Sequence, residues 1–482
     1  MVELYKRMGF FSNPFSRFSA EEEIDYLAKI YHKPKYFSVL LDEIKGNNSR
    51  IIFGDRGAGK SALMVAVKNK VEESGEAKDF LLITIDDYSY LLASSNNIEK
   101  KWVILLIRNL LKSLLPCLLQ KDKNLFDKTE REKLSFIVTN FYQTISKSEF
   151  ERICGSYKTY NEVVNPALNT VINAGVAITS DLISKSLGLP SVDKDNFYKD
   201  YFPKIDVAKK AELLNLEFFE LLQILNDAIS LCNKAGFKSI VFFMDKIDED
   251  TQMGGKIKQE SIVLTPILLN TKILLDNKFC LIFLLWSKIR DELNRNSVRL
   301  DKIKSIDVTW ESSELRKIIE KRVEYFSTGK TTLNGMFLDL KDIDKLLYLA
   351  NGSPRDLLRV LSAIYDEEEN SPNSAGIFST ANVTKAIFKF LLNYDFYSVY
   401  PSQDKSRQDI KSIIAKLKKI NKISFKAKDL ISTFKFSQPA SVSYIKVMKD
   451  FGVIKEDQEI TGKEKQYSIV DPKVEYIVKY QI

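Results

Sequence analysis

The chain has 482 residues, of which 45% are hydrophobic, 28% charged and 11% aromatic, and its formal net charge is +8. This composition is typical of folded globular proteins and excludes a largely disordered chain. The longest wholly apolar run, Phe279 to Trp286, is far too short for a membrane-spanning helix, which needs about 20 residues.

The cysteine and histidine content excludes several kinds of site. Four cysteines lie far apart and there is one histidine, so we expect no zinc knuckle, disulfide framework or multi-histidine metal centre. Residues 1–11 mix charged and aromatic side chains, unlike a secretion signal. We therefore expect a cytoplasmic protein without membrane contact.

The positive charge is concentrated at the end of the chain. Residues 401–482 hold 17 Lys and Arg against 10 Asp and Glu, which gives +7 of the total +8. A basic C-terminal segment on an otherwise near-neutral chain indicates an anionic partner, and nucleic acid is the first candidate. A solvated lysine-rich surface would give the same charge, so charge alone does not identify the partner.

Residues 54–61, Gly-Asp-Arg-Gly-Ala-Gly-Lys-Ser, fit the pattern G-x-x-x-x-G-K-[ST] of a phosphate-binding loop. The apolar residues before the loop indicate a buried strand, and those after it a helix. Glycines let backbone N–H groups converge on phosphate oxygens, and the helix N-terminus favours an anion. Lys60 would reach the β- and γ-phosphates, and the Ser61 hydroxyl would bind Mg²⁺. The residues expected at the nucleotide are Gly54, Asp55, Arg56, Gly57, Ala58, Gly59, Lys60 and Ser61.

After a second strand at Phe80–Ile85, the next one starts only near Ser239, a gap much longer than an ordinary connection. Apolar helices are expected at Lys101–Leu119 and Ala208–Lys234. Residues 120–207 between them indicate a mostly helical insertion. Its segment Leu168–Leu189 is rich in small residues, which leaves a membrane-associating hairpin open beside the favoured helix packed in protein.

Ser239–Asp245 is an apolar run of the kind found in central parallel strands, and it ends in acid. Parallel sheets bind ligands at the carboxyl ends of their strands, and a phosphate loop needs a carboxylate there for Mg²⁺. We assign Asp245 to Mg²⁺ and Glu249 to activation of the attacking water, with Asp248 as the competing candidate. A solvated acidic turn is the alternative reading.

Gly54–Ser61 together with Asp245–Glu249 resembles the paired motifs of the AAA+ and STAND branches of P-loop ATPases. The form D-x-x-D-E is similar to that of STAND switches and of bacterial ATPases close to origin-recognition proteins. This resemblance implies ATP as the nucleotide, Mg²⁺-dependent hydrolysis and a homo-oligomer or partner protein. Asn13-Pro14-Phe15 resembles a stretch that borders the adenine in related ATPases; without that comparison it is a turn with an aromatic anchor.

Phe279–Trp286 indicates a further buried strand. In AAA+ proteins the polar residue at its end senses the γ-phosphate, which implies Ser287 here, where asparagine or threonine is more usual. Three arginines follow, Arg290, Arg295 and Arg299. One of them could act as an arginine finger in the site of a neighbouring subunit. The alternative is that they are part of a basic loop and helix.

Four helices expected beyond residue 310 form a helical lid, at Glu311–Ser327, Asp342–Ala350, Arg355–Asp366 and Val383–Leu392. Gly352 can end a helix, while Ser353 and Pro354 can begin the next one. The resulting G-x-P-R form is similar to the sensor-2 motif of origin-recognition and STAND ATPases, which implies that Arg355 contacts the γ-phosphate. An ordinary helix junction with a surface arginine is the alternative.

The polar stretch around Pro401 marks the last boundary. Beyond it, three helices and two short strands at Val453–Lys455 and Lys465–Val470 predict a winged helix, whose third helix can enter the major groove of DNA. The helices are expected at Ile410–Ile420, Lys426–Phe434 and Ala440–Phe451. Winged helices also dock proteins, so both partners stay open.

On the third helix of this domain we expect Val442, Ile445 and Met448 to face the core and Ser443 and Val447 to point away. Because that face has no arginine to read guanine, phosphate contact is better supported than sequence readout. The lysines expected at phosphates are Lys411, Lys416, Lys418, Lys446 and Lys463.

The sequence thus predicts an α/β fold: a P-loop core with a parallel sheet at 1–310, containing the insertion, a helical lid at 311–400 and a winged helix at 401–482. Three functions are compatible with it. They are an ATPase motor or loader coupled to duplex DNA, a slow signalling switch acting through a protein partner, and a non-enzymatic scaffold. The resemblance associates the switch with phage defence or mobile elements. The scaffold is disfavoured because every expected catalytic residue type is present.

Overall fold

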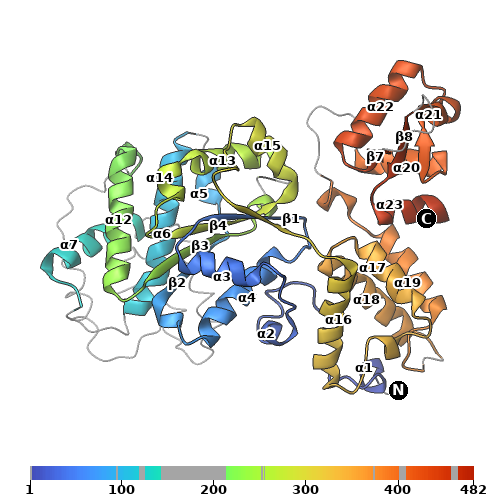
Figure 1. Ribbon diagram of the computed structural model, residues 1–482, viewed down its shortest axis with the longest axis horizontal. Coiled ribbons are helices and arrows are strands. Elements are labelled where there is room, and N and C mark those ends of the chain that lie inside the picture. The colour runs from blue at the N-terminus through green and yellow to red at the C-terminus, as the bar shows by residue number, and fades with distance from the viewer. Residues whose placement is uncertain are drawn as a thin grey trace, which may run out of the picture.

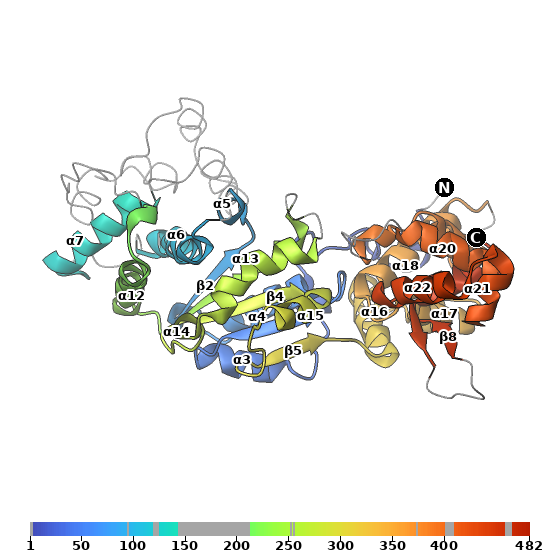
Figure 2. The same ribbon diagram turned by 90° about the horizontal axis from the view of Figure 1, so that it is seen from above.

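The structure is a computed structural model. It describes residues 3–93, 96–118, 125–142, 213–250, 253, 256–372, 375–400, 409–457 and 465–482. The α/β core lies at one end of an elongated molecule, and the lid and C-terminal unit lie at the other (Figures 1 and 2). The predicted segment Leu168–Leu189, the boundary at Pro401 and Lys463 lie outside the described residues.

The core is built on a five-stranded sheet in which every neighbouring pair is parallel, in the order β2-β3-β4-β1-β5. This confirms the α/β class and the parallel sheet. The strands are β1 (Arg50–Gly54), β2 (Phe80–Ile85), β3 (Ser239–Met244), β4 (Cys280–Trp286) and β5 (Ser305–Val308). The edge strand β5 was not predicted, because it has only four residues and its polar residues Ser305 and Asp307 are exposed.

Two hydrophobic clusters cover opposite faces of the sheet, because successive side chains of a strand point to opposite sides. Ile52 and Ile282 belong to the cluster on the side of α3 (Phe37–Lys45) and α4 (Lys60–Glu73). Ile51 and Leu281 belong to the cluster on the other side. That second face is covered by α6 (Ile98–Leu118), α12 (Phe218–Lys234) and α13 (Ile257–Leu269) (Figure 2).

Helix α12 starts later than the sequence indicated. Its predicted start was Ala208, but the helix begins at Phe218, where the backbone N–H of Glu217 donates to the Glu220 carboxylate at 2.7 Å. Other core and N-terminal helices are α1 (Leu4–Arg7), α2 (Leu27–Ile30), α5 (Ser89–Leu92), α7 (Lys128–Ile137), α14 (Thr271–Leu274) and α15 (Arg290–Arg295).

The four helices expected beyond the core are present. They are α16 (Ser312–Ser327), α17 (Lys341–Ala350), α18 (Pro354–Glu369) and α19 (Thr380–Leu392). The segment after α1 contacts the end of α16. The Phe11 backbone N–H donates to the Phe326 carbonyl at 3.0 Å, and the two rings stack. The Thr331 hydroxyl donates to the Met8 carbonyl at 2.6 Å.

The C-terminal unit contains a three-stranded antiparallel sheet in the order β6-β8-β7, surrounded by helices. Two of its elements were not predicted, the three-residue strand β6 and the last helix, α23. Its elements are α20 (Ile410–Ile420), β6 (Ser424–Lys426), α21 (Ala427–Phe434), α22 (Gln438–Asp450), β7 (Ile454–Glu456), β8 (Gln466–Ile469) and α23 (Pro472–Tyr480).

The expected inward face of α22 was partly wrong. Ile445 and Met448 are buried as expected. Val442 is 55% exposed, however, and Tyr444 is buried in its stead. The helix is rotated relative to the expectation because Ser441, which is fully buried, faces inward and donates its hydroxyl to the Ser437 carbonyl. Among the described residues, no helix combines the length and hydropathy needed to cross a membrane.

Candidate functional site

The loop between β1 and α4 has the backbone shape that its glycines allow. Gly57 and Gly59 have φ values of +84° and +92°, a region that other residues rarely adopt. A Cβ on Gly57 would lie 2.6 Å from the Ser353 hydroxyl of the lid, so the space is closed to a side chain. The loop and the start of α18 are therefore in direct contact.

Lys60, the first residue of α4, is buried, and its ammonium group donates to the Gly54 carbonyl at 2.8 Å. Burial lowers the pKa of Lys60, while the nearby carboxylates of Asp248 and Asp245 act to raise it. A buried cation beside an open pocket gains most when an anion arrives to compensate it. This is the arrangement expected of a phosphate-binding lysine.

The Ser61 hydroxyl donates to Asp245 Oδ2 at 2.7 Å, which joins the loop to the end of β3. Asp245 is buried, and burial raises its pKa, against the opposing effects of the Ser61 hydrogen bond and the Lys60 charge. Mg²⁺ in nucleotide sites is held by one or two protein oxygens, water and substrate phosphates. Ser61 and Asp245 supply such a pair. The described residues contain no cluster of three or more metal-ligating side chains.

The two remaining acidic candidates differ in their surroundings. Lys246 adopts a left-handed conformation with φ of +61°, and a short turn at Ile247–Glu249 follows. Asp248 is buried and accepts a hydrogen bond from Arg56 Nε at 2.8 Å. Glu249 is exposed and lines the pocket. Both residues thus line the pocket, but Asp248 is buried and paired, whereas Glu249 is exposed.

Arg355 reaches the site from the start of α18. Its backbone N–H donates to the Gly57 carbonyl at 3.3 Å, and its side chain lines the pocket. The helix start is as the sequence indicated, with the Ser353 hydroxyl accepting from the Asp356 N–H at 3.1 Å. Trp310, which precedes the lid, donates its indole N–H to the Ala58 carbonyl at 2.8 Å. Sequence reasoning did not identify this second contact between the lid segment and the loop.

These groups surround a pocket with an empty volume of about 1000 Å³, open solvent included. Its lining includes charged residues from the phosphate loop, the acidic turn and α18, among them Lys60, Asp245 and Arg355. It also includes the apolar and aromatic residues Phe18, Leu27, Ile30, Tyr31, His32, Trp310, Ile318 and Leu358. A pocket with both charged and apolar lining suits a phosphorylated molecule with a flat ring system.

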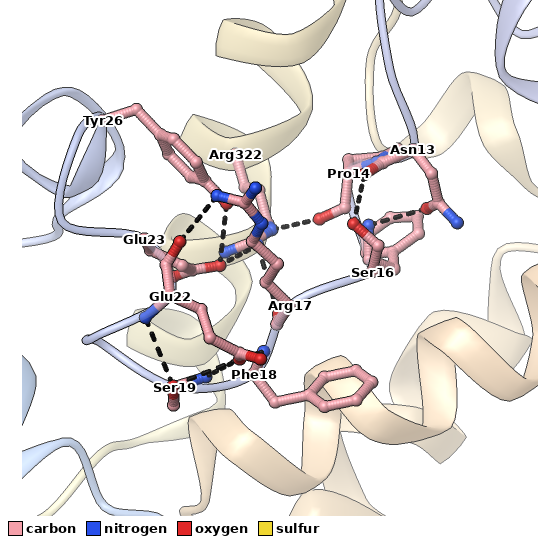
Figure 3. Close-up of polar contacts among 11 residues, drawn as sticks. Asn13, Pro14, Ser16, Arg17, Phe18, Ser19, Glu22, Glu23, Tyr26 and Arg322 are labelled. Carbon is pink, nitrogen blue, oxygen red and sulfur yellow. Dashed lines mark hydrogen bonds and ion pairs between the residues drawn. The ribbon is translucent and has the colours of Figure 1, made fainter. Parts of the chain in front are cut away.

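Residues of the N-terminal segment line the pocket, but they are not Asn13, Pro14 or Phe15. Asn13 accepts a hydrogen bond from the Phe15 N–H at 2.8 Å, and Phe15 is fully buried. The residues that line the pocket come after this turn. The segment is held by buried Arg322, which pairs with Glu23 and donates to the Pro14 carbonyl (Figure 3).

The side chains after β4 also have partners within the chain. Ser287 donates its hydroxyl to Asp55, a residue of the phosphate loop. Arg290 pairs with Asp307 and lies over the Phe53 ring. The other two arginines pair locally, Arg295 with Glu292 at 3.0 Å and Arg299 with Asp301 at 2.7 Å, so the structure brings none of the three into the pocket of its own chain.

Glu260 of α13 is a second feature that sequence reasoning did not identify. Its side chain is fully buried, and neither carboxyl oxygen has a hydrogen-bond partner in the described part of the chain. Burial, reinforced by the Asp248 charge, raises the pKa of Glu260 to about 8. The group is therefore protonated near neutral pH. Glu260 stands among the polar residues Lys258, Gln259 and Ser261, so the sequence gives no sign of its burial.

No protein-family model and no curated protein sequence matches the chain. Among solved structures, it is similar to the Aeropyrum pernix ORC1 protein in complex with DNA, at 12% identity and a TM-score of 0.33, covering 99% of this chain and 96% of that one. It is also similar to the Aeropyrum pernix ORC2 protein in ADPNP–ADP complexes, at 11% identity and a TM-score of 0.39, covering 99% and 98%. Both are ORC proteins. At these scores we draw no functional conclusion from them.

Proposed function

We propose that the chain is a Mg²⁺-dependent ATPase of AAA+/STAND type, with hydrolysis coupled to duplex DNA through residues 401–482. The observation that carries the proposal is that Lys60, Ser61 and Asp245 line the same pocket, with Ser61 hydrogen-bonded to Asp245. These residues come from the loop after β1 and the end of β3, which parallel pairing brings to the same edge of the sheet.

The roles of the side chains follow from their positions. Lys60 would compensate charge on the β- and γ-phosphates, and Arg355 would contact the γ-phosphate from the lid. Ser61 and Asp245 would hold Mg²⁺, which neutralises charge on the phosphate oxygens when bound. Glu249 would orient a water molecule for attack on the γ-phosphorus, so that the bond to the β-phosphate oxygen breaks and ADP leaves.

Both residues line the pocket, but Glu249 is the better candidate for the water because its side chain is exposed, whereas the Asp248 carboxylate is buried and accepts a hydrogen bond from Arg56. A general base has to lie within hydrogen-bond reach of the proton that it takes. The participation of an arginine from another copy, and homo-oligomer formation with it, stay predictions.

The proposal of DNA as the coupled partner rests on charge. Residues 401–482 carry +7, and Lys411 and Lys446 of the C-terminal unit are exposed, although the Lys411 ammonium lies over the Tyr397 ring. Lys416, which lies over the Tyr444 ring, and Lys418, which bonds to the Ile482 carbonyl, are half-buried and so less available. A surface of this kind suits contact with phosphates more than readout of bases.

The test is steady-state ATP hydrolysis by the full chain, with and without duplex DNA, at low and physiological salt. We expect Mg²⁺-dependent turnover that DNA stimulates, with stimulation fading as salt rises because phosphate contacts release counterions. Lys60→Ala, the control, should bind no ATP. Turnover indifferent to DNA would favour a signalling switch with a protein partner, and tight ATP binding by Lys60→Ala would overturn the assignment of the loop.

A further inference from the structure

We propose that Arg56, which lines the pocket, is a positioning residue that couples the phosphate loop to the C-terminal unit, rather than a ligand of the nucleotide. The inference rests on the proposed function, since it concerns what the nucleotide site controls. It starts from the contacts of the Arg56 guanidinium, whose side chain is 19% exposed.

The guanidinium joins three parts of the molecule. Its Nε and Nη2 donate to Asp248, to the carboxylate and to the backbone carbonyl, each at 2.8 Å. Its Nη1 donates to the Ser398 carbonyl at 3.2 Å, and its plane lies over the Trp286 ring, 4.6 Å from the centroid. Arg56 thus links the acidic turn, the end of β4 and a segment just beyond the lid.

Ser398 belongs to the short turn Phe396–Ser398, which lies between α19 and the C-terminal unit. The residues beside it are bound to that unit: the Tyr397 hydroxyl donates to Asp409 at 3.1 Å, and the Tyr400 hydroxyl donates to buried Asp471 at 2.8 Å. The carbonyl that Arg56 contacts is therefore held in place by the C-terminal unit.

The lid and the C-terminal unit are in turn joined by a buried ion pair. Lys473 of α23 pairs with Asp356 of α18 at 3.0 Å, with side chains 4% and 10% exposed, and the Tyr394 hydroxyl donates to the same carboxylate at 2.7 Å. Separating a buried pair leaves uncompensated charges, so lid and unit are expected to move together. That body meets the phosphate loop at Gly57, through Arg355, and at Arg56.

The Arg56 guanidinium therefore has to donate hydrogen bonds to Asp248 and to Ser398 at the same time. If the loop rearranges around phosphates, the Ser398 contact changes with it, which gives the nucleotide a physical route to the C-terminal unit. A lysine at this position keeps the charge but lacks the planar fork that makes the three contacts together. Arg56→Lys thus separates geometry from charge.

The experiment is hydrogen exchange on the full chain, with and without Mg²⁺ and a non-hydrolysable ATP analogue, following peptides that cover residues 396–400 and 409–420. In the wild type we expect nucleotide to change exchange at residues 398–400 by about fivefold or more, the lower range of coupling between sites. Arg56→Lys, compared with the wild type at concentrations of the analogue that saturate both proteins, should lose most of that response.

The matched control is Arg316→Lys, which alters an arginine of α16 that pairs with Glu320 on the surface, and it should respond like the wild type. If Arg56→Lys does not fold, judged by its circular dichroism, Arg56→Gln takes its place.

The outcomes separate the two proposals. A wild type that binds the analogue but shows no change at residues 396–400, or an Arg56 variant that keeps the change, overturns the coupling alone. A variant that no longer binds the analogue shows Arg56 to be a nucleotide ligand and also overturns it. A wild type that binds no nucleotide removes the proposed function, and the coupling with it.

Discussion

Glu249 and Asp248 are neighbours in the chain and both line the pocket, but Glu249 is exposed, whereas Asp248 is buried and held by Arg56. We expect Glu249→Gln to bind ATP nearly as wild type does but to lower kcat about 100-fold or more, since a positioned base contributes this much. The measurement is single-turnover hydrolysis beside equilibrium binding of a fluorescent ATP analogue.

The matched variant is Asp248→Asn, which keeps the shape of the side chain and weakens its bond to Arg56. It should lower kcat less than Glu249→Gln does. Unchanged turnover of Glu249→Gln, with a collapse in Asp248→Asn, would transfer the water-activating role to Asp248.

The residues of the site were predictable where the signal is local. The phosphate loop and the acidic end of β3 are short patterns in which each residue type has one physical task. The bond of Arg56 to Asp248 spans 192 positions of sequence and its bond to Ser398 spans 342, so no spacing rule reveals them. The burial of Glu260 likewise depends on how α13 packs, which a pattern of residue types does not specify.

At the scale of the element, the protonation of Glu260 in α13 should make the stability of the protein depend on pH. The folded state holds a proton on Glu260 up to a pH of about 8, while the unfolded chain releases it near its ordinary value of 4.5. Because the folded state binds more protons between these values, this group's contribution to stability falls as pH rises through that window.

Glu260→Gln, which resembles the protonated acid, should remove this dependence. We expect nearly equal free energies of unfolding for wild type and variant near pH 5, and a variant more stable by about 4 kcal/mol near pH 9. Denaturant unfolding at both values measures it. A stability difference that does not vary with pH would contradict a protonated Glu260.

The elements themselves were predicted best where they are long or well capped. The buried strands β2, β3 and β4 are apolar runs, and α18 has a serine cap with proline behind it. The two missed strands, β5 and β6, are short and exist through pairing with neighbours, which gives no signal within the segment itself.

At the scale of the whole molecule, the pair Lys473–Asp356 should hold the C-terminal unit on the lid. We expect Lys473→Met to destabilise the protein by about 3 kcal/mol or more, because Asp356 would be left buried without its cation. Urea unfolding, followed together with limited proteolysis of residues 409–482, measures this loss. Lys465→Met, which removes an exposed partner of Glu456, is the control and should change little. Equal effects of both substitutions would contradict a structural role for the buried pair.

The central sheet also divides the molecule into two compartments. The cluster on the α3 and α4 side continues into the lid and the C-terminal unit, whereas the cluster on the other side is built from α6, α12 and α13. The described residues between α6 and α12 that belong to the second compartment include Phe126, Leu134 and Phe141, which are buried in it. A reporter sequence inserted directly after α6 would therefore begin on the face of the sheet opposite the helix that follows the phosphate loop.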